Sequence, residues 1–517
     1  MNQIPKIVFA LISFVRTDRV ADTVRALAQR PSSDCVRGTW NRTSRRHNFP
    51  EGLAPWLKLL GDGEENWYRF PMPTEIHSPR KAPLLKGAAL VLVMLIRWTL
   101  AAADWPQWRG PDRDGVWTES GILTSFPATG PALKWKVPVG LGYSSPVIQG
   151  GRLYLTDVVA AQPIIHERTL CLNARSGKRM WTTQHDATPP EWFFSPAQLR
   201  GPGATPILHG GRVYGLSMFS VLKCLDAQTG TVLWKRDLVA EYKLPPSSLD
   251  ASPLIDNNLL ILSIGGRPGA GVVALDLSTG REVWRALSES ATWSSPVIIS
   301  AGGTRQLIVW MRESVTSLNP TNGAVYWREP TVSGGSPGFS AVSTPVLRGD
   351  RLLISGLMFQ LDQTKPAGKV LWPDTPSGTR RILSDTSTPL LRDDFIYSPR
   401  SGGTFVCLEA ETGRERWQTN AITGLRRGAS VHFVPNGSSL YLYTDRGDLI
   451  RAELSPSGYR ELDRAHLIEP TSPLFEDKFA WSAPSMANRN LFVRNDQELR
   501  CYSMAGNSRP SSRESKR

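Results

Sequence analysis

The sequence predicts an all-β protein in which one small four-stranded sheet is repeated around a ring. Three observations lead to this fold class. The 517 residues include 44 Gly and 40 Pro, and so many helix-breaking residues are incompatible with long helical bundles. The chain also has 18 Trp and only 21% charged residues, which is enough apolar surface for a large core. Finally, one short motif recurs along the chain, and such a period indicates a repeat architecture.

The recurring motif is a turn that leads to a tryptophan. Its form is Asp or Asn, two residues, Thr or Ser, then Gly, with Trp four residues after the glycine. The Asp or Asn side chain can bond nearby backbone N–H groups and the glycine tolerates a positive φ, so the turn is expected to begin the outer strand of each unit. Successive tryptophans lie 53, 50, 43, 45 and 45 residues apart. The residues assigned to the motif are Asp226, Asp276, Gly177, Gly230, Gly280, Gly323, Gly413, Trp181, Trp234, Trp284, Trp327, Trp372 and Trp417.

A second marker, Ser or Thr followed by Pro, precedes each copy of the motif. It is expected to begin the first strand of the unit, where a proline removes no ladder hydrogen bond. Turns such as Gly150-Gly151 then lead into a second strand. Two later units, around 430–454 and 482–502, have no tryptophan at the motif position, which brings the number of units to eight. The markers begin at Ser145, Thr205, Ser252, Ser295, Thr344 and Thr388.

A single four-stranded unit cannot bury both of its faces, so the units are expected to pack against one another. A period of 43–53 residues with four strands predicts blades around a central channel, that is, one eight-bladed β-propeller with antiparallel blades. Residues 133–139 precede the first marker and have the pattern of an unattached outer strand. Donating this N-terminal strand to the eighth blade would close the ring and remove an open sheet edge. Trp135 would then occupy the tryptophan position of that blade.

The segment from Ala274 to Trp284 resembles the tryptophan-docking motif of the pyrroloquinoline-quinone (PQQ) repeat propellers. That superfamily includes quinoprotein alcohol dehydrogenases and the propeller subunit of the bacterial outer-membrane protein assembly machine. The resemblance covers about residues 132–504, and it implies that each motif tryptophan packs against the neighbouring blade. The stretch DWPQWRGP at 104–111 is similar to the mature start of exported propellers of this kind. We expect residues 104–131 to lie along the propeller rim.

Residues 81–103 have the order of an export signal. Lys81 and Lys86 precede a largely apolar run at 87–100, and three alanines follow at 101–103. The run is interrupted by Arg97 and is shorter than the roughly twenty residues that span a bilayer. We expect residues 1–80 to be unstructured or untranslated, with translation starting at Met72, and residues 505–517 to be a disordered basic tail. No Cys directly follows the apolar run at 87–100, so we expect no lipid anchor. The protein is expected in the periplasm or outside the cell, without a stable membrane span after cleavage of the signal.

Catalytic patterns are weak throughout the sequence. In many enzymes of the resembled superfamily a pair of adjacent cysteines faces the cofactor, and this chain has no Cys-Cys pair. Asp226 and Asp276 fall in repeat turns, where a turn role explains them better than metal ligation. Three cysteines share one slot of the repeat and are expected to be small buried residues. The histidines show no metal-ligand spacing and are expected to be at the surface or hydrogen-bonded; those considered are His166, His185, His209 and His432.

The segment Gly265–Gly271 looks superficially like a phosphate loop, but it lacks the Lys-Ser/Thr pair of such loops and is better explained as a hairpin. Four longer segments are expected to form loops that shape binding surfaces, and residues 192–194 (Trp-Phe-Phe) are expected to be exposed anchors on one of them. These loops are 157–170, 183–203, 236–250 and 329–342.

The function expected from these observations is binding. The net charge is +14, but 15 of the 60 Lys and Arg lie in residues 1–103 and the others are scattered, so we expect no nucleic-acid partner. The prediction is an exported, non-enzymatic and monomeric propeller without a cofactor, which acts as a scaffold for an envelope protein or ligand. Two alternatives stay open: a PQQ- and Ca²⁺-dependent alcohol or sugar oxidoreductase, and a propeller that binds envelope polysaccharide.

Overall fold

The computed structural model describes residues 104–195, 199–245, 249–331, 341–373, 383–474 and 476–506. All of them belong to one compact unit, Leu84–Arg517. The predicted export signal, the proposed start at Met72 and the tail beyond residue 506 lie outside the described residues.

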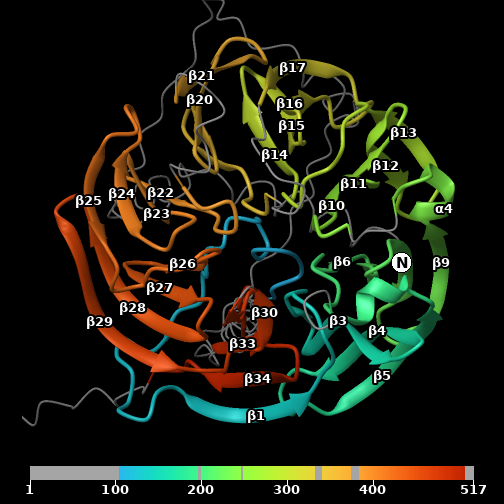
Figure 1. Ribbon diagram of the computed structural model, residues 1–517, viewed down its shortest axis with the longest axis horizontal. Helices are drawn as coiled ribbons and strands as arrows, with labels where there is room; N and C mark the ends of the chain where they lie inside the picture. The colour runs from blue at the N-terminus through green and yellow to red at the C-terminus, as the bar shows by residue number, and fades with distance from the viewer. Residues whose placement is uncertain are drawn as a thin grey trace, which may run out of the picture. The chain divides into compact units, whose positions relative to one another are not determined.

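Eight four-stranded antiparallel sheets follow one another along the chain and surround a common axis, as Figure 1 shows. The first two blades contain β2 (Val147–Gln149), β3 (Arg152–Ala161), β4 (Ile164–Asn173) and β5 (Arg179–Ala187), then β6 (Ile207–His209), β7 (Arg212–Leu216), β8 (Val221–Asp226) and β9 (Val232–Asp237). The third and fourth contain β10 (Leu254–Asp256), β11 (Leu259–Gly266), β12 (Ala270–Asp276) and β13 (Glu282–Ala286), then β14 (Val297–Ala301), β15 (Thr304–Trp310), β16 (Ser314–Leu318) and β17 (Val325–Pro330).

The remaining blades repeat this order. The fifth and sixth contain β18 (Val346–Arg348), β19 (Arg351–Ile354), β20 (Leu357–Leu361) and β21 (Gly368–Trp372), then β22 (Leu390–Arg392), β23 (Phe395–Pro399), β24 (Phe405–Glu409) and β25 (Glu415–Thr419). The seventh contains β26 (Val431–Asn436), β27 (Ser439–Thr444), β28 (Asp448–Ser455) and β29 (Gly458–His466). The eighth contains β32 (Ser485–Ala487), β33 (Asn490–Arg494), β34 (Glu498–Ser503) and β1 (Ala132–Pro138).

The ring is closed by the strand from the N-terminal side of the propeller. β1 pairs antiparallel with β34, with Trp135 opposite Cys501 and Val137 opposite Leu499. In Figure 1 the blue β1 lies beside the red β34 although almost the whole propeller separates them in sequence. The predicted eight-bladed all-β fold and its closure by an N-terminal strand are therefore confirmed.

Each motif tryptophan lies against the turn of the next blade. The indole of Trp234 covers Gly280, and its N–H donates to the Leu277 carbonyl of the same turn at 3.2 Å. The same arrangement, with the indole N–H donating to a turn carbonyl of the following blade, occurs for Trp135 on Ala174, Trp181 on Ala227, Trp284 on Pro320, Trp372 on Ala410 and Trp417 on Ser455. Between blades, buried apolar side chains such as Leu222 of β8 and Leu260 of β11 belong to one cluster, so the core lies between neighbouring sheets.

Two blades depart from this pattern for reasons visible in their sequences. The fifth blade lacks the Thr-Gly turn, and there Trp327 packs near Gly368 while its N–H donates to Gln306 of its own blade at 2.9 Å. In the seventh blade, Arg451 and Asp463 form the cross-strand pair that cysteine and tryptophan form elsewhere, with Nε and Oδ2 2.7 Å apart. Where the turn or the tryptophan is missing, a hydrogen bond within the blade links the outer strand to an inner one, from Trp327 to Gln306 and from Arg451 to Asp463.

Replacing Gly280 with alanine should destabilise the fold by more than φ strain alone. Gly280 has φ of +69°, and an added Cβ would lie 2.8 Å from the Trp234 ring. Gly150 has a similar φ of +58° with no atom within 4 Å of an added Cβ. We expect Gly150→Ala to cost about 1–2 kcal/mol for the left-handed backbone, and Gly280→Ala about 1–3 kcal/mol more, because the added methyl overpacks the indole. Urea denaturation of both variants measures the difference; equal losses would mean that the indole does not press on this glycine.

The Ser/Thr-Pro markers connect neighbouring blades around the axis. The hydroxyl of one marker accepts the backbone N–H of the preceding marker: Thr205 Oγ1 from Ser145, Ser252 Oγ from Thr205, Ser295 Oγ from Ser252 and Thr388 Oγ1 from Thr344, all at 3.0–3.1 Å. These bonds satisfy buried N–H groups at the point where each chain segment enters its innermost strand. The sequence identified the marker as a strand start, and the structure adds this role between blades.

Several predicted loops have regular structure. Most of 157–170 lies in β3 and β4, which make the first blade taller than the others. The segment 183–203 contains the end of β5 and a 3₁₀ turn, η1 (Glu191–Phe194), and 236–250 contains the helix α4 (Leu238–Tyr242). Most of 329–342 lies outside the described residues. The expectation of three exposed anchors was wrong for Phe193, which is fully buried, whereas Trp192 is 47% exposed.

Candidate functional site

The segment that follows the predicted signal lies in the middle of the propeller. Trp105 forms an antiparallel bridge with Ile148 of β2, and the Pro106 carbonyl accepts the N–H of Leu208 in β6. The indole N–H of Trp108 donates to Thr344 Oγ1, at the start of the fifth blade, at 2.9 Å. In Figure 1 this blue stretch crosses the centre of the ring. The expectation of a rim segment therefore differs from the structure, because these residues contact the innermost strands and their starts.

A buried arginine fixes this segment in place. Arg113 is 7% exposed, and its Nη1 donates to the Pro253 carbonyl at 2.8 Å and to Gln107 Oε1 at 3.1 Å. Trp117 extends the attachment to the seventh blade, because its backbone N–H donates to the Pro435 carbonyl at 2.8 Å. Contacts to the third and seventh blades thus hold Trp108 at the axis.

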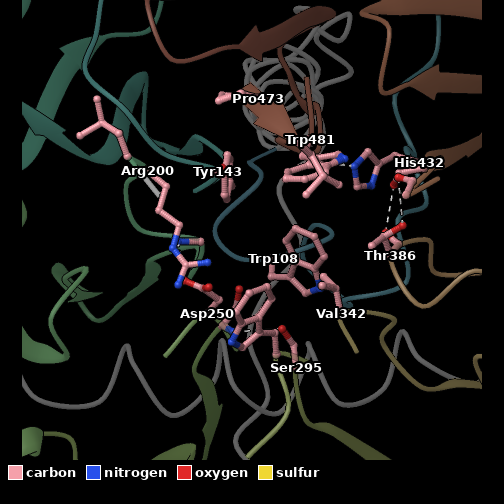
Figure 2. A pocket seen from close by; sticks show the side chains of 17 residues that line it. Trp108, Tyr143, Arg200, Asp250, Ser295, Val342, Thr386, His432, Pro473 and Trp481 are labelled. Carbon is pink, nitrogen blue, oxygen red and sulfur yellow. Dashed lines mark hydrogen bonds between the residues drawn. The ribbon is translucent and has the colours of Figure 1, made fainter. Parts of the chain in front are cut away.

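Trp108 forms part of a pocket on the propeller axis, which we call the axial pocket. Its volume is about 200 Å³, and Figure 2 shows how side chains from many blades converge on it. The residues that line it are Trp108, Tyr143, Leu199, Arg200, Gly203, Asp250, Ser252, Trp293, Ser295, Val342, Thr386, Gly428, Ser430, His432, Pro473, Leu474 and Trp481.

Aromatic rings dominate the lining of the axial pocket. The Trp481 ring stacks on Phe479 at 4.8 Å and meets Tyr143 edge-on at 5.4 Å. The Arg200 guanidinium lies over the Trp293 ring, 5.3 Å from its centroid. Stacked and cation–π contacts of this kind favour particular orientations of the side chains that line the pocket.

Polar groups are few and specifically placed. In Figure 2 the Arg200 guanidinium is turned toward the Asp250 carboxylate, and Asp250 Oδ1 also accepts the N–H of Gly203 at 2.9 Å. On the opposite side, Ser430 Oγ donates to the Thr386 carbonyl at 3.0 Å. The indole N–H of Trp481 is shielded from solvent and has no hydrogen-bond partner within the described part of the chain. A buried donor without an acceptor costs free energy, and this N–H belongs to a side chain that lines the pocket.

His432 should make stability depend on acidity. Its ring meets Trp108 edge-on at 6.4 Å, Nε2 lies 3.1 Å from the Trp481 carbonyl, and burial, the largest cause, lowers its pKa to about 4. Between pH 6.5 and 4 the unfolded chain takes up a proton that the folded chain refuses. The free energy of unfolding therefore falls as the pH is lowered, by up to about 1.4 kcal/mol per pH unit, and this loss levels off below pH 4.

Urea denaturation at pH 4, 5, 6 and 7 measures this dependence. His432→Gln keeps a polar side chain of similar size and should show a smaller decrease over the same range, while Trp192→Ala, outside the pocket, should keep the wild-type decrease. The same pH dependence in His432→Gln and wild type would contradict the assignment to His432.

The docking-motif residues singled out from the sequence do not line the axial pocket, whereas two marker serines, Ser252 and Ser295, and His432 do. The motif tryptophans and glycines lie at the outer strands and turns. Asp226 Oδ1 accepts N–H groups of Gln228 and Thr229 inside its turn. Asp276 does the same with Ser278 and Thr279, and the hydroxyls of those two residues are the main reason that its pKa falls to about 2. The cysteines Cys171, Cys224, Cys407 and Cys501 are buried and free, and Gly265–Gly271 spans the β11–β12 hairpin.

A sequence signal for the pocket did exist. Tyr143, Trp293 and Trp481 each stand three residues before the proline that leads into an innermost strand, Pro146, Pro296 and Pro484 respectively. Because the markers begin the innermost strands, an aromatic residue just before one of them is placed near the axis. Because the markers were interpreted only as strand starts, these aromatic residues were not predicted to line a pocket. Trp108 and His432 were not predicted to line it either.

The donor set of the axial pocket does not fit the Ca²⁺ ion of a quinone-dependent site. Ca²⁺ takes six to eight oxygen ligands, usually with several carboxylates. Asp250 is the single carboxylate among the described residues that line the pocket. Over the described ranges as a whole, no group of three or more His, Cys, Asp or Glu side chains is arranged to hold a metal ion.

Eight four-stranded blades, seven of which carry a docking tryptophan, closed by an N-terminal strand define a PQQ-like β-propeller, and comparison with known proteins agrees. A family model described as outer membrane protein assembly factor BamB matches residues 166–419 of this chain, in agreement with this superfamily. The BamB of Moranella endobia is 23% identical over 52% of this chain and 69% of its own length. The BamB of Yersinia pestis is 25% identical over 58% of this chain and 73% of its own length.

Quinoprotein enzymes share the fold. The crystal structure of quinohemoprotein alcohol dehydrogenase from Comamonas testosteroni matches with a TM-score of 0.57 at 14% identity, over 83% of this chain and 85% of that one. Sequence matches to quinoprotein and quinohemoprotein alcohol dehydrogenases and to a tetrathionate hydrolase are shorter, over 28% to 45% of this chain. Similarity at this level establishes the propeller architecture and no more.

Proposed function

We propose that this protein is an exported, non-enzymatic propeller of the cell envelope that binds an envelope protein through its axial pocket. The observation that carries the proposal is the pocket itself: the chain's own segment at 104–117 occupies the axis and leaves a recess lined by aromatic side chains. At about 200 Å³ the recess is smaller than the roughly 300–1,000 Å³ of pockets for drug-sized ligands. It matches one large anchoring side chain, which is how binding energy is concentrated in protein interfaces.

The relatives and the predicted export signal support an envelope location. The family model and the two relatives described above carry the name of an outer membrane protein assembly factor. Residues 81–103 have the order of a signal peptide. Within the described residues, no helix is long and apolar enough to cross a membrane.

Affinity capture from the envelope fraction, read out by mass spectrometry, tests this function. Wild-type protein and Trp192→Ala should retain the same envelope protein, because Trp192 lies outside the axial pocket. Trp481→Ala should lose at least about tenfold of the captured partner, as expected for a central interface anchor. Circular dichroism must show that all three proteins are folded. Equal capture by Trp481→Ala and wild type would contradict binding at the pocket.

Two further assays address the alternatives. Mixing the protein with PQQ and Ca²⁺ should give neither a bound chromophore nor dye-linked alcohol oxidation; stoichiometric binding with turnover would overturn the non-enzymatic function. A pull-down on envelope polysaccharide should not retain the protein. Retention that Trp481→Ala abolishes would replace the protein partner with a polymer.

A further inference from the structure

A second cleft lies between the first and second blades, away from the axis. It has a volume of about 780 Å³. One wall is the extended part of β4 and β5, and the other is formed by β8, β9 and the helix α4 that follows them. Pro190, Phe219 and Val239 give it apolar surface. The cleft exists because the first blade is taller than the others and because α4 follows the outer strand of the second.

Three ionisable side chains stand in a row in this cleft. Lys223 Nζ lies 2.5 Å from His185 Nδ1, and His185 Nε2 lies 2.8 Å from Glu167 Oε2. With a lysine N–H donating to Nδ1, the imidazole tautomer that carries its proton on Nε2 would direct that N–H toward the Glu167 carboxylate. Glu167 is 3% exposed and is held in place by the backbone N–H of Phe219, which donates to Oε1 at 3.0 Å.

The surroundings of Lys223 make its ammonium group easier to deprotonate than that of an exposed lysine. Its pKa is lowered to about 8, first by burial and then by Lys235, while the Glu167 carboxylate opposes this shift. Lys235 is directly opposite Lys223 in the β8–β9 pair. The other charged groups that line the cleft are Asp186 of β5 and Asp237 of β9. A lysine that is desolvated and placed beside a second cation is a recognised form of activated nucleophile.

The repeat does not require this cluster. The outer strands of the second to sixth blades are five or six residues long, such as β13 and β25, whereas β5 has nine residues and continues to Ala187. Glu167 and His185 are paired with each other in the extended part of β4 and β5. Burying a carboxylate, an imidazole and an amine costs free energy, and the described parts of the other blades form their sheets without such a cluster.

We propose that Lys223 is a nucleophilic amine that captures an aldehyde as an imine, with His185 as its proton acceptor and Glu167 as the group that orients the imidazole. The nitrogen lone pair attacks the carbonyl carbon, a C–N bond forms, and the C=O π pair moves to oxygen, which takes a proton from solvent water in the open cleft, so that the product is the protonated imine. The nitrogen gives its proton to His185 Nδ1. The imidazolium, stabilised by the Glu167 carboxylate, then returns a proton to the departing hydroxyl, and water leaves as the C=N bond forms.

Reductive trapping with mass spectrometry tests this reaction. The folded protein is treated with limiting propanal and sodium cyanoborohydride, and propylation is measured at each lysine over pH 6–10. Lys223 should be labelled at least about tenfold faster at pH 7.5 than exposed Lys178, with a rate that rises around pH 8. Lys178→Arg serves as the matched control and should leave the labelling of Lys223 unchanged.

Two variants separate an activated amine from a merely buried one. Lys223→Arg should remove the fast adduct from this segment and leave other lysines unaffected. His185→Gln should slow labelling of Lys223 about tenfold and move the rise in rate to higher pH. Labelling of Lys223 no faster than that of Lys178, labelling only in denaturant, or an unchanged rate and pH profile in His185→Gln would each overturn the proposal. The cleft and the axial pocket share no lining residue among those described, so the two proposals fail independently.

Discussion

Trp284→Ala is expected to lower the free energy of unfolding by about 3–5 kcal/mol, the range for truncating a buried large aromatic side chain. Trp284 is 7% exposed, and its indole N–H donates to the Pro320 carbonyl of the next blade at 3.1 Å. An added Cβ on Gly323 would lie 2.7 Å from the ring, which shows how closely the indole covers the neighbouring turn. Truncation would open a cavity between the third and fourth blades and leave the carbonyl without its partner.

Urea denaturation followed by circular dichroism measures this loss. Trp192→Ala is the matched control, because Trp192 is 47% exposed and outside the docking positions; it should change the free energy of unfolding by about 0.5 kcal/mol or less. If the two variants had the same denaturation midpoint, the tryptophans would not be what holds the blades together.

Replacing Arg494 should have an effect of similar size at the ring closure. Arg494 is fully buried on β33 of the last blade. Its Nη2 donates to the Gly140 carbonyl just after β1 at 2.5 Å, and its Nη1 donates to the Thr156 carbonyl in β3 at 3.2 Å. One guanidinium therefore joins the last blade, the closing strand and the first blade. We expect Arg494→Met to cost about 3–5 kcal/mol, as for removing one side of a buried charged network.

The control for Arg494 is an arginine in an exposed ion pair. Arg285 lies 3.4 Å from Glu282 and its side chain is 56% exposed, so Arg285→Met should cost less than about 1 kcal/mol. Because Arg494 acts at the closure, its variant should also become sensitive to limited proteolysis between β1 and β2 before global unfolding. A variant with wild-type stability and no new cleavage there would contradict this role.

The features that could be predicted from the sequence are local ones. The turn at Asp276, the glycine at Gly280 and the tryptophan at Trp284 lie within nine residues, and each has a backbone or packing reason that needs no other part of the chain. The closing strand was also predictable. The last unit had only three strands, and residues 133–139 formed an extra strand before the first unit, which was already complete.

Other features could not be predicted because opposite roles share the same local pattern. Arg494 stands at the end of an apolar strand, where a charged residue ordinarily points to solvent, yet the structure buries it against carbonyls of other blades. His432 was expected to be at the surface or hydrogen-bonded. It is hydrogen-bonded, to the Trp481 carbonyl, but it lies at the axis beside Trp108. The stretch 104–111 was assigned to the rim because its residue types do not indicate which strands of the propeller it contacts.

The sequence by itself determined the number of blades, their order and the strand that closes them, because these follow from a repeat whose every copy is read within a short segment. Only the tertiary structure decided where the axial pocket and the Lys223 cluster lie. Closing the ring brings Trp108 to Thr344, 236 positions away, and the added height of one blade brings Glu167 and His185 to a lysine of the next. Contacts of this kind depend on the curvature and packing of whole blades, which no single segment encodes.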